Sequence, residues 1–408
     1  MEKRTILIIC YNTLHNDPRV LRQIDALKEE YKIVAAGYSN PNRNTGFIEL
    51  EQMKYKVISF YFNYPILIRK CFSLGTLLYL RAERVRKKLK DNLLKMTLKK
   101  SMYYENKYWD EVKKRNYDQL KDVKADLIIA NDIYTLPLGA KLKNGSSKLV
   151  FDAHEYSPGE NDTNLYWVEH LKGIILNTCK TYFPKVDKMF CVGHSIAEAY
   201  KTNFGITSTV ITNASELVDL KPVKNEGSRI RLIHHGASIR ERHLERMIEA
   251  MGLVDDRFSL DLMLMVADPL YMDELKEMSK AYPNVNFIDP VATDKIPYVL
   301  NKYDAGIVFI PPVNFNYEFC LPNKFYESVQ GRLALILGPT KDMTDISAKY
   351  NNAIISKDFS IKALAEVISK LDSDSVNRMK AGSDSCAKEM NAKINAAIMR
   401  REIKQLLN

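Results

Sequence analysis

The sequence contains few cysteines and glycines, and it has no long hydrophobic run. Only six of its 408 residues are cysteine, and none of these form a CxxC pair or share a zinc-ligand spacing with a histidine. A disulfide framework is therefore not expected, and we predict reduced, mostly buried thiols. No stretch of about 18 uncharged apolar residues occurs, which argues against a membrane-spanning helix. The apolar run Ile6–Cys10 is also too short for the core of a signal peptide.

The first predicted strand-to-helix turn, residues 11–20, contains no glycine. It therefore lacks a GxGxxG fingerprint, and the chain has no P-loop motif, which disfavours dinucleotide-dependent dehydrogenases and P-loop nucleoside triphosphatases. The turn instead carries Asn16-Asp17-Pro18-Arg19, in which Asp17 suits the N-cap of a helix and Pro18 its first position. Neither role requires Arg19, which becomes a candidate contact for an acceptor or a membrane.

Short apolar runs alternate with helical patterns in two successive series. The predicted strands of the first series are Thr5–Cys10, Ile33–Ala36, Leu127–Ala130, Leu149–Phe151, Lys188–Val192 and Val210–Ile211. Those of the second are Arg231–His234, Leu260–Val266, Val285–Phe287, Ala305–Phe309, Ala334–Leu337 and Ala353–Ile355. Apolar strands that alternate with helices indicate α/β domains with doubly wound parallel sheets.

This alternation predicts two domains of comparable size. We place them at residues 1–217 and 230–384, joined by a polar linker at 218–229 that contains Pro222 and Gly227. The remaining segment, 385–408, has helical periodicity and no strand after it, and we expect it to pack back toward the first domain.

Most of the positive charge lies in one segment. The formal net charge of the chain is +10, and residues 69–100 contain eleven lysines and arginines but only two acidic residues. Aromatic and aliphatic side chains precede and interleave these charges from residue 62 onward, as in an interfacial amphipathic element. We therefore predict that segment 62–100 binds an anionic membrane surface or acceptor, with Arg84, Lys87 and Lys88 as candidate contacts. A merely solvated helix is the alternative, and nucleic acid is disfavoured because no nucleic-acid-binding module accompanies the segment.

Polar residues follow the predicted strand Leu149–Phe151. They are Asp152, His154 and Glu155, and the carboxyl ends of strands in an open α/β sheet border the ligand crevice. A histidine beside carboxylates at this position can orient a hydroxyl group or assist proton transfer. The alternative is a histidine that serves only the structure.

Two further clusters lie in the second domain. His234-His235-Gly236 ends a predicted strand, and Arg242 follows at a helix entrance. Glycine permits close backbone approach, and arginine can bind a diphosphate. A metal site is not predicted, because the adjacent histidines point to opposite faces of a strand and no third ligand lies nearby.

The other cluster opens the predicted helix that ends at Gln330. Asn323 lies at the helix start, where free N–H groups point outward, and Lys324 supplies a charge for a phosphate. Glu327, one turn later, can accept two hydroxyl groups of a ribose.

The order and spacing of these motifs, across nearly the whole chain, resemble the glycosyltransferase family 4 group. The matching segments are NDPRV, FDAHE, FCVGHSIAEAYKTNFGI followed by VITNA, HHGASIRERHLERMIEA and PNKFYESVQG. The resemblance implies the GT-B fold, in which two Rossmann-like domains face a central cleft, the first binding the acceptor and the second a nucleotide sugar. It also implies sugar transfer with retention of configuration, without a metal ion or another cofactor.

The resemblance also assigns roles to individual residues. Gly236 lies under the diphosphate, Arg242 binds it, Glu327 contacts the ribose and His154 lies near the transferred sugar. Two positions depart from the family pattern. Phe319 stands where the first glutamate of a pair is expected. Whether Glu318, one position earlier, replaces that glutamate is left open. Ala237 stands in place of an arginine, so that diphosphate binding depends on Arg242 and Lys324.

These observations predict a hexose-transferring glycosyltransferase. Its predicted catalytic residues are His154, Glu155, Arg242 and Lys324, and its predicted donor-binding residues are Gly236, Arg242, Glu318, Asn323, Lys324 and Glu327. We expect a lipid-linked saccharide or glycan acceptor in the synthesis of a bacterial surface polysaccharide, such as a capsule or lipopolysaccharide, or of a glycolipid. The expected location is cytoplasmic, peripheral on the inner face of the cell membrane. The alternatives are a sugar-nucleotide epimerase of the same fold and a non-catalytic partner subunit.

Overall fold

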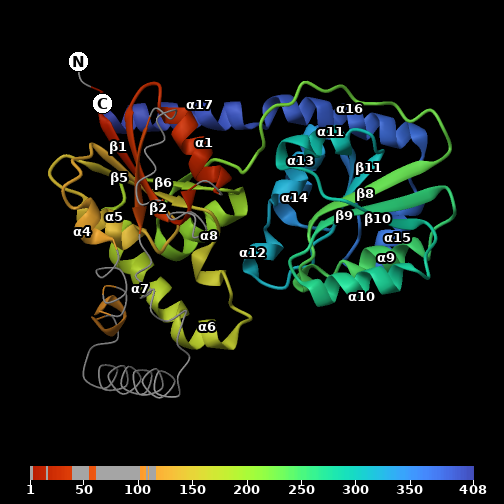
Figure 1. Ribbon diagram of the computed structural model, residues 1–408, viewed down its shortest axis with the longest axis horizontal. Coiled ribbons are helices and arrows are strands. Elements are labelled where there is room, and N and C mark those ends of the chain that lie inside the picture. The colour runs from red at the N-terminus through yellow and green to blue at the C-terminus, as the bar shows by residue number, and fades with distance from the viewer. Residues whose placement is uncertain (1–2, 15–16, 39–54, 61–101, 107–108, 110–115) are drawn as a thin grey trace, which may run out of the picture. The chain divides into compact units, whose positions relative to one another are not determined.

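The chain forms two compact α/β units. The computed structural model describes residues 3–14, 17–38, 55–60, 102–106, 109 and 116–408 (Figure 1). The first unit comprises Met1–Phe190, Tyr200–Ser208 and Glu402–Asn408, and the second comprises Cys191–Ala199 and Thr209–Arg401. The predicted basic segment 62–100, with Arg84, Lys87 and Lys88, lies outside the described residues.

The first unit is built on a seven-stranded sheet in the order β3-β2-β1-β4-β5-β6-β7. Its strands are β1 (Thr5–Thr13), β2 (Lys32–Tyr38), β3 (Tyr55–Phe60), β4 (Leu127–Asn131), β5 (Lys148–Ala153), β6 (Lys188–Cys191) and β7 (Ser208–Val210). Ile6 on β1 pairs in parallel with Ile33 on β2 and with Leu127 on β4. Ile6, Leu7, Ile8 and Ile9 are fully buried, because both faces of such a parallel sheet are covered by helices.

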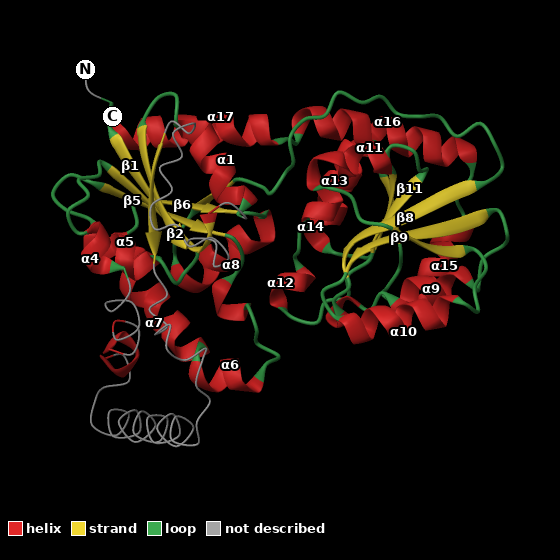
Figure 2. Ribbon diagram, viewed as in Figure 1, coloured by secondary structure: helices red, strands yellow, loops and turns green. Residues whose placement is uncertain are grey.

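Helices flank this sheet (Figure 2). They are α1 (Pro18–Leu27), α4 (Tyr117–Leu120), α5 (Leu136–Leu142), α7 (Lys172–Tyr182), α8 (His194–Phe204) and the end of α17 (Ala392–Leu407), with short 3-10 turns η3 (Ser157–Gly159) and η4 (Phe183–Lys185). Helix α6 (Leu165–His170) packs on α7. Glu402 on α17 forms an ion pair with Lys188 at the start of β6. The last residues of the chain thus contribute to the unit that also contains its first strand.

The second unit contains a parallel six-stranded sheet in the order β10-β9-β8-β11-β12-β13. Its strands are β8 (Ile230–Ala237), β9 (Phe258–Met265), β10 (Val285–Ile288), β11 (Ala305–Val308), β12 (Ala334–Leu337) and β13 (Ala353–Ile355). Its helices are α9 (Glu245–Met251), α10 (Pro269–Ser279), α11 (Ile296–Leu300), α12 (Phe315–Glu318), α13 (Asn323–Gln330), α14 (Lys341–Tyr350), α15 (Ile361–Ser369) and α16 (Ser373–Glu389), with 3-10 turns η5 (Arg240–Arg242) and η6 (Thr293–Lys295). Two clusters of buried apolar side chains form the core of this unit.

Each sheet has one point at which its strand order reverses. In the first unit the reversal lies between β1 and β4, and in the second it lies between β8 and β11. Ligands of open α/β sheets bind outside the carboxyl ends of the strands at such points. The residues that follow β1, β4, β8 and β11 are therefore expected to border the ligand sites.

The predicted fold class, two doubly wound α/β domains, is confirmed. Strand β3 was not among the predicted strands, because Lys56 and Ser59 interrupt its apolar character. It lies at the edge of the first sheet. No described helix is both long and apolar enough to cross a membrane.

Candidate functional site

In the second unit, Gly236 near the end of β8 lies against two cationic side chains. Its φ of 131° is a conformation that residues with a side chain rarely adopt. A Cβ atom added here would lie 3.2 Å from Nζ of Lys324 and 3.7 Å from Nη1 of Arg242. The missing side chain thus leaves space in which both cations approach the end of the strand.

Arg242 ends the short η5 turn that follows β8. Its Nη1 donates only a long hydrogen bond, 3.5 Å, to the carbonyl oxygen of Ala237. Its Nε is buried and has no hydrogen-bond partner among the residues that the structure describes. Buried donors are nearly always paired in folded proteins, so this orphaned group indicates a place for an external acceptor.

Neighbouring contacts hold the loop that carries Arg242. Arg240 donates two hydrogen bonds to Glu274, 2.7 and 2.9 Å long, and stacks on the ring of Tyr271. His243 adopts a left-handed conformation and contacts Glu245 at 2.9 Å. Arg240 therefore stabilises this loop, whereas the Nε–H group of Arg242 has no hydrogen-bond acceptor among the described residues.

Lys324 lies in the first turn of α13 and is buried, with 6% of its surface exposed. Its Nζ lies 3.2 Å from Nε2 of His234, and it forms no ion pair with a carboxylate within the described part of the chain. Burial and, next, the neighbouring Arg242 lower the pKa of Lys324 to about 7. An uncompensated buried cation is costly, and a bound anion would offset that cost.

The ring of His234 is fixed from its other side. Nδ1 lies 2.8 Å from the carbonyl oxygen of Ile307 on β11. Burial and the charge of Lys324 hold the pKa of His234 well below its usual range, so the ring is neutral. Because a carbonyl oxygen only accepts, Nδ1 carries the proton and Nε2 accepts a hydrogen bond from Lys324.

Glu327 lies one helical turn after Lys324. Its Oε2 is 2.8 Å from Nε2 of His235, which is 4% exposed. Asn323, at the start of α13, is exposed, and Pro322 at the N-cap position makes no side-chain hydrogen bond to this helix start. The structure thus brings Gly236, Arg242, Lys324 and Glu327 into one cluster at the carboxyl end of β8.

Glu318 and Phe319 lie just before this cluster. Glu318 ends α12 with an exposed side chain. The ring of Phe319 packs against that of Phe315, with 4.9 Å between the ring centroids. An aromatic pair therefore occupies the position at which the family resemblance would place a carboxylate.

In the first unit, His154 follows β5 and contacts the residues that end β4. Its Nε2 lies 3.2 Å from Oδ1 of Asn131, and its Nδ1 lies 3.4 Å from Oδ2 of Asp132. Asp132 has a left-handed φ of 65°, which is a strained conformation for a residue other than glycine. Both ring nitrogens of His154 thus face polar groups of the neighbouring strand end.

A buried polar network connects this histidine to α1. Gln23 donates a 2.8 Å hydrogen bond to Asn131 and a second one to Asp152. Asp152 also receives two hydrogen bonds from Arg19. Burial alone would raise the pKa of Asp152, but the Arg19 guanidinium holds it below its usual value.

The local sequence explains how Arg19 and Gln23 reach the same carboxylate. Asp17 caps α1 through the backbone N–H groups of Arg19 and Val20, and Pro18 begins the helix, both as predicted. Residues four apart on a helix share one face. Arg19 is consequently buried against Asp152, and its charge is not exposed in the way that the predicted acceptor or membrane contact requires.

The side chains of Glu155 and Glu160 interact with each other and with Asp132, the residue that His154 contacts. Burial, followed by the charges of Glu160 and Asp132, raises the pKa of Glu155 to about 8. A hydrogen bond joins Glu155 and Glu160, and the hydroxyl group of Tyr134 lies 3.4 Å from Oε2 of Glu160. The raised pKa of Glu155 favours its protonated form, which donates the hydrogen bond to Glu160.

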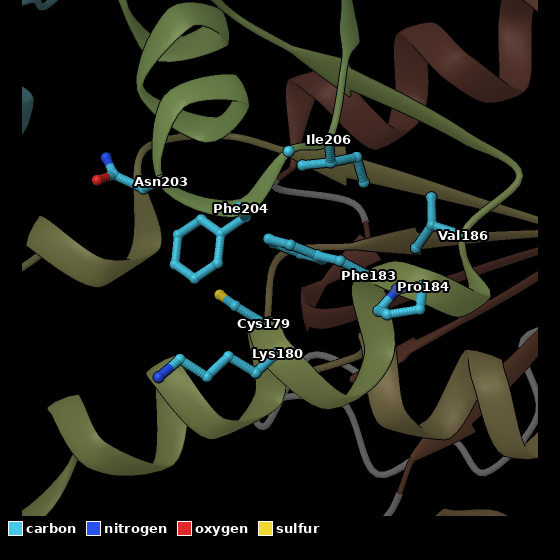
Figure 3. A pocket seen from close by; sticks show the side chains of 9 residues that line it. Cys179, Lys180, Phe183, Pro184, Val186, Asn203, Phe204 and Ile206 are labelled. Atoms are coloured by element: carbon cyan, nitrogen blue, oxygen red, sulfur yellow. The ribbon is translucent and has the colours of Figure 1, made fainter.

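A separate hollow of about 540 Å³ lies on the first unit (Figure 3). The residues around it are Cys179, Lys180, Phe183, Pro184, Val186, Asn203, Phe204, Gly205 and Ile206. None of the predicted site residues lines this hollow, and we assign it no role.

Sequence reasoning missed several members of these clusters. Asn131 and Asp132 directly follow a predicted strand, which is the same signal that marked His154. The roles of His234 and His235 had no comparable signal, because their partners lie 90 and 92 positions away in the chain.

The sequence matches no protein-family model, and no curated protein matches it. Solved structures do share its fold over almost the whole chain. They include a sucrose-phosphate synthase from Thermosynechococcus elongatus (TM-score 0.71, 12% identity, 99% of each chain covered). The Anabaena HepE protein in complex with UDP has a TM-score of 0.65 at 12% identity and covers 98% of this chain and 100% of its own.

An α,α-trehalose-phosphate synthase (UDP-forming) from Burkholderia vietnamiensis is also similar (TM-score 0.63, 12% identity, 98% of this chain and 100% of its own). At these identities the likeness concerns the fold. The chain has the two-domain, Rossmann-like fold of GT-B glycosyltransferases, as predicted.

The Arg19–Asp152 pair allows a test of stability. We expect Asp152→Asn to reduce the free energy of unfolding by about 3–5 kcal/mol, because it leaves the buried Arg19 without a counter-charge. Urea unfolding measures this change. Asp118→Asn, in an exposed pair with Lys121, is the control and should have little effect. Equal effects of the two substitutions would contradict a buried, stabilising ion pair.

The lowered pKa of Lys324 predicts that an anionic ligand binds together with a proton. At pH 8 the amino group of Lys324 is mostly uncharged in the unliganded protein. A bound diphosphate favours the charged, ammonium form of this group. UDP binding should therefore take up close to one proton per ligand at pH 8, and its affinity should fall as the pH rises above 7.

Calorimetric titration with UDP in two buffers of different ionisation enthalpy measures this uptake. Lys324→Met should abolish it. An unchanged uptake in that variant would show that another group titrates.

Proposed function

We propose that this protein is a glycosyltransferase that takes its sugar from a nucleotide-sugar donor. The observation that carries the proposal is the convergence of Lys324 and the unpaired Arg242 Nε at Gly236, where no carboxylate of the described residues forms an ion pair with either cation. Two cations of this kind suit a diphosphate. UDP is bound in the HepE structure of the same fold, which supports a nucleoside diphosphate as the occupant.

The proposed roles follow from the chemistry of transfer. The bond between the anomeric carbon and the diphosphate oxygen breaks, a bond to the acceptor oxygen forms, and the proton of the acceptor hydroxyl passes to the departing diphosphate. Negative charge grows on the departing diphosphate, where preorganised cations lower the barrier. Arg242 and Lys324 fulfil this role, so the proposal requires neither a metal ion nor a cofactor, and Glu327 accepts hydrogen bonds from the ribose.

We assign supporting roles to the first unit. His154 orients the transferred sugar, as the family resemblance implies, and the partly buried Glu155 beside it acts only as a hydrogen-bond donor. Arg19 acts through Asp152 and Gln23 as a positioning residue rather than as a contact for the acceptor. Retention of the anomeric configuration is part of the proposal.

The acceptor side of the proposal rests on the sequence. The positive charge of segment 62–100 supports a lipid-linked saccharide or glycan acceptor at an anionic membrane surface. The corresponding location is the cytoplasmic face of the cell membrane, and the corresponding pathway is synthesis of a surface polysaccharide or glycolipid.

One observation favours a second candidate. The Phe315–Phe319 ring pair stands where a donor-binding carboxylate is expected, which would suit a subunit that binds the donor without transferring its sugar. Donor binding without hydrolysis or transfer, in the presence of a crude lipid acceptor mixture, would support that candidate.

A thermal-shift panel of nucleotide sugars tests the donor. A ligand that binds only the folded state raises the melting temperature, and we expect one nucleoside diphosphate series to do so. If no nucleotide sugar shifts the transition, the proposed function is wrong.

Substitutions test the site itself. Because one buried donor group contributes about 3–4 kcal/mol, Arg242→Ala and Lys324→Ala should each lower the turnover number by about 10²–10³-fold. Glu327→Ala should mainly raise the KM of the donor. Initial rates of transfer measure these effects.

Two variants serve as controls. Arg231→Ala, at the opposite end of β8, and Lys341→Ala remove exposed cations and should leave the rates unchanged. Wild-type rates in all three site variants would contradict the assignment.

A further inference from the structure

Two adjacent histidines on β8 contact two residues of one helix. His234 and His235 are 0% and 4% exposed, respectively, at the carboxyl end of the strand. Their partners, Lys324 and Glu327, are three residues apart on α13 and therefore lie on one side of that helix. Each histidine thus contacts one residue of the candidate donor site.

His234 holds the Lys324 ammonium group without neutralising it. The hydrogen bond from Nδ1 to the carbonyl oxygen of Ile307 anchors the ring to the neighbouring strand β11. Nε2 then presents a neutral acceptor, 3.2 Å from Nζ. A lysine side chain is a flexible point charge that needs such a restraint. A carboxylate would restrain it too, but would cancel the charge that an anionic ligand requires.

His235 acts in the same way on Glu327. Its Nε2 lies 2.8 Å from Oε2 of the carboxylate. The other oxygen, Oε1, has no hydrogen bond among the described residues, and the side chain of Glu327 is 14% exposed. Since a carboxylate oxygen accepts more than one hydrogen bond, a donor at Oε2 orients the group and still leaves it able to bind a diol.

Metal binding is not supported as the reason for the two histidines. Among the residues that the structure describes, no group of three or more histidine, cysteine, aspartate or glutamate side chains could hold a metal ion. Each histidine instead has a separate polar partner on α13.

We propose that His234 and His235 are positioning residues of the donor site, His234 for the ammonium group of Lys324 and His235 for the carboxylate of Glu327. The inference rests on the proposed function of this site and extends it to two residues that need not touch the donor. The ligand class is a nucleoside diphosphate, whose phosphates depend on His234 and whose ribose depends on His235.

Matched asparagine and glutamine variants separate positioning from packing. The amide of glutamine reaches the place of a histidine Nε2, whereas the amide of asparagine reaches only that of Nδ1. His234→Asn can therefore keep the bond to Ile307 but not the one to Lys324, and His234→Gln can restore an acceptor for Lys324. In the same way, His235→Gln can still donate to Glu327 and His235→Asn cannot.

We expect each asparagine variant to raise the Kd for UDP by about tenfold, as for loss of one hydrogen bond to a charged group, and each glutamine variant to recover most of this loss. Inorganic pyrophosphate should bind less tightly to His234→Asn but equally well to His235→Asn. In transfer assays, His234→Asn should mainly lower kcat and His235→Asn should mainly raise KM. Calorimetry and initial rates measure these effects, with His170→Asn on α6 as the control histidine.

Two results would overturn the proposal. One is a wild-type Kd in both asparagine variants. The other is an equal loss in the asparagine and glutamine variants together with a lower melting temperature, which would indicate that the imidazole rings only fill space. If the wild-type protein binds neither UDP nor pyrophosphate, the proposed function fails instead, which is a distinguishable result.

Nuclear magnetic resonance of the unliganded wild-type protein tests the geometry without any variant of these histidines. The ring nitrogens of His234 should show a protonated Nδ1 and an unprotonated Nε2, and Lys324→Met should shift the Nε2 resonance. A protonated Nε2 in His234 would overturn the proposed role, because that nitrogen could not accept a hydrogen bond from Lys324.

Discussion

The second unit depends on a charge that the protein buries and does not neutralise. Lys324 and Arg242 converge on the backbone at Gly236, and the described residues offer them a neutral imidazole and a long bond to a carbonyl oxygen. Burial of a cation without a counter-ion costs free energy. Gly236, the anchored His234 ring and the η5 loop hold the two cations in place, so that a bound anion would offset this cost.

The first unit handles buried charge in the opposite way. Arg19 and Asp152 neutralise each other, and Gln23 and Asn131 extend the contacts to His154. This network connects α1 with the ends of β4 and β5, so that it fixes the chain around the point where the strand order reverses. In the first unit, the buried charges of Arg19 and Asp152 are thus paired with each other. In the second unit, two cations lack a counter-charge among the described residues.

The sequence predicted the fold and the local features better than the distant contacts. Apolar strands, the Asp17 cap and the cluster at the start of α13 depend on near neighbours in the chain, and patterns of a few residues reveal them. Edge strand β3 was not predicted, because polar residues interrupt its apolar pattern. The sequence predicted Arg19 as a contact for an acceptor or a membrane because its partner, Asp152, lies 133 positions away and cannot be recognised from neighbouring residues. His234 and His235 were expected to face opposite sides of a strand, and only the packing of α13 over the end of β8 gives both of them partners.

The separation of these partners has a consequence for how the protein is made. Lys324 and Glu327 follow their histidines by 90 and 92 residues. During synthesis, β8 therefore leaves the ribosome well before α13 exists, and the cluster is complete only when most of the second unit has emerged. A chain that stops before α13 retains Gly236 and Arg242 but lacks half of the cluster. Occupancy of the site thus reports that this part of the polypeptide has been finished and folded.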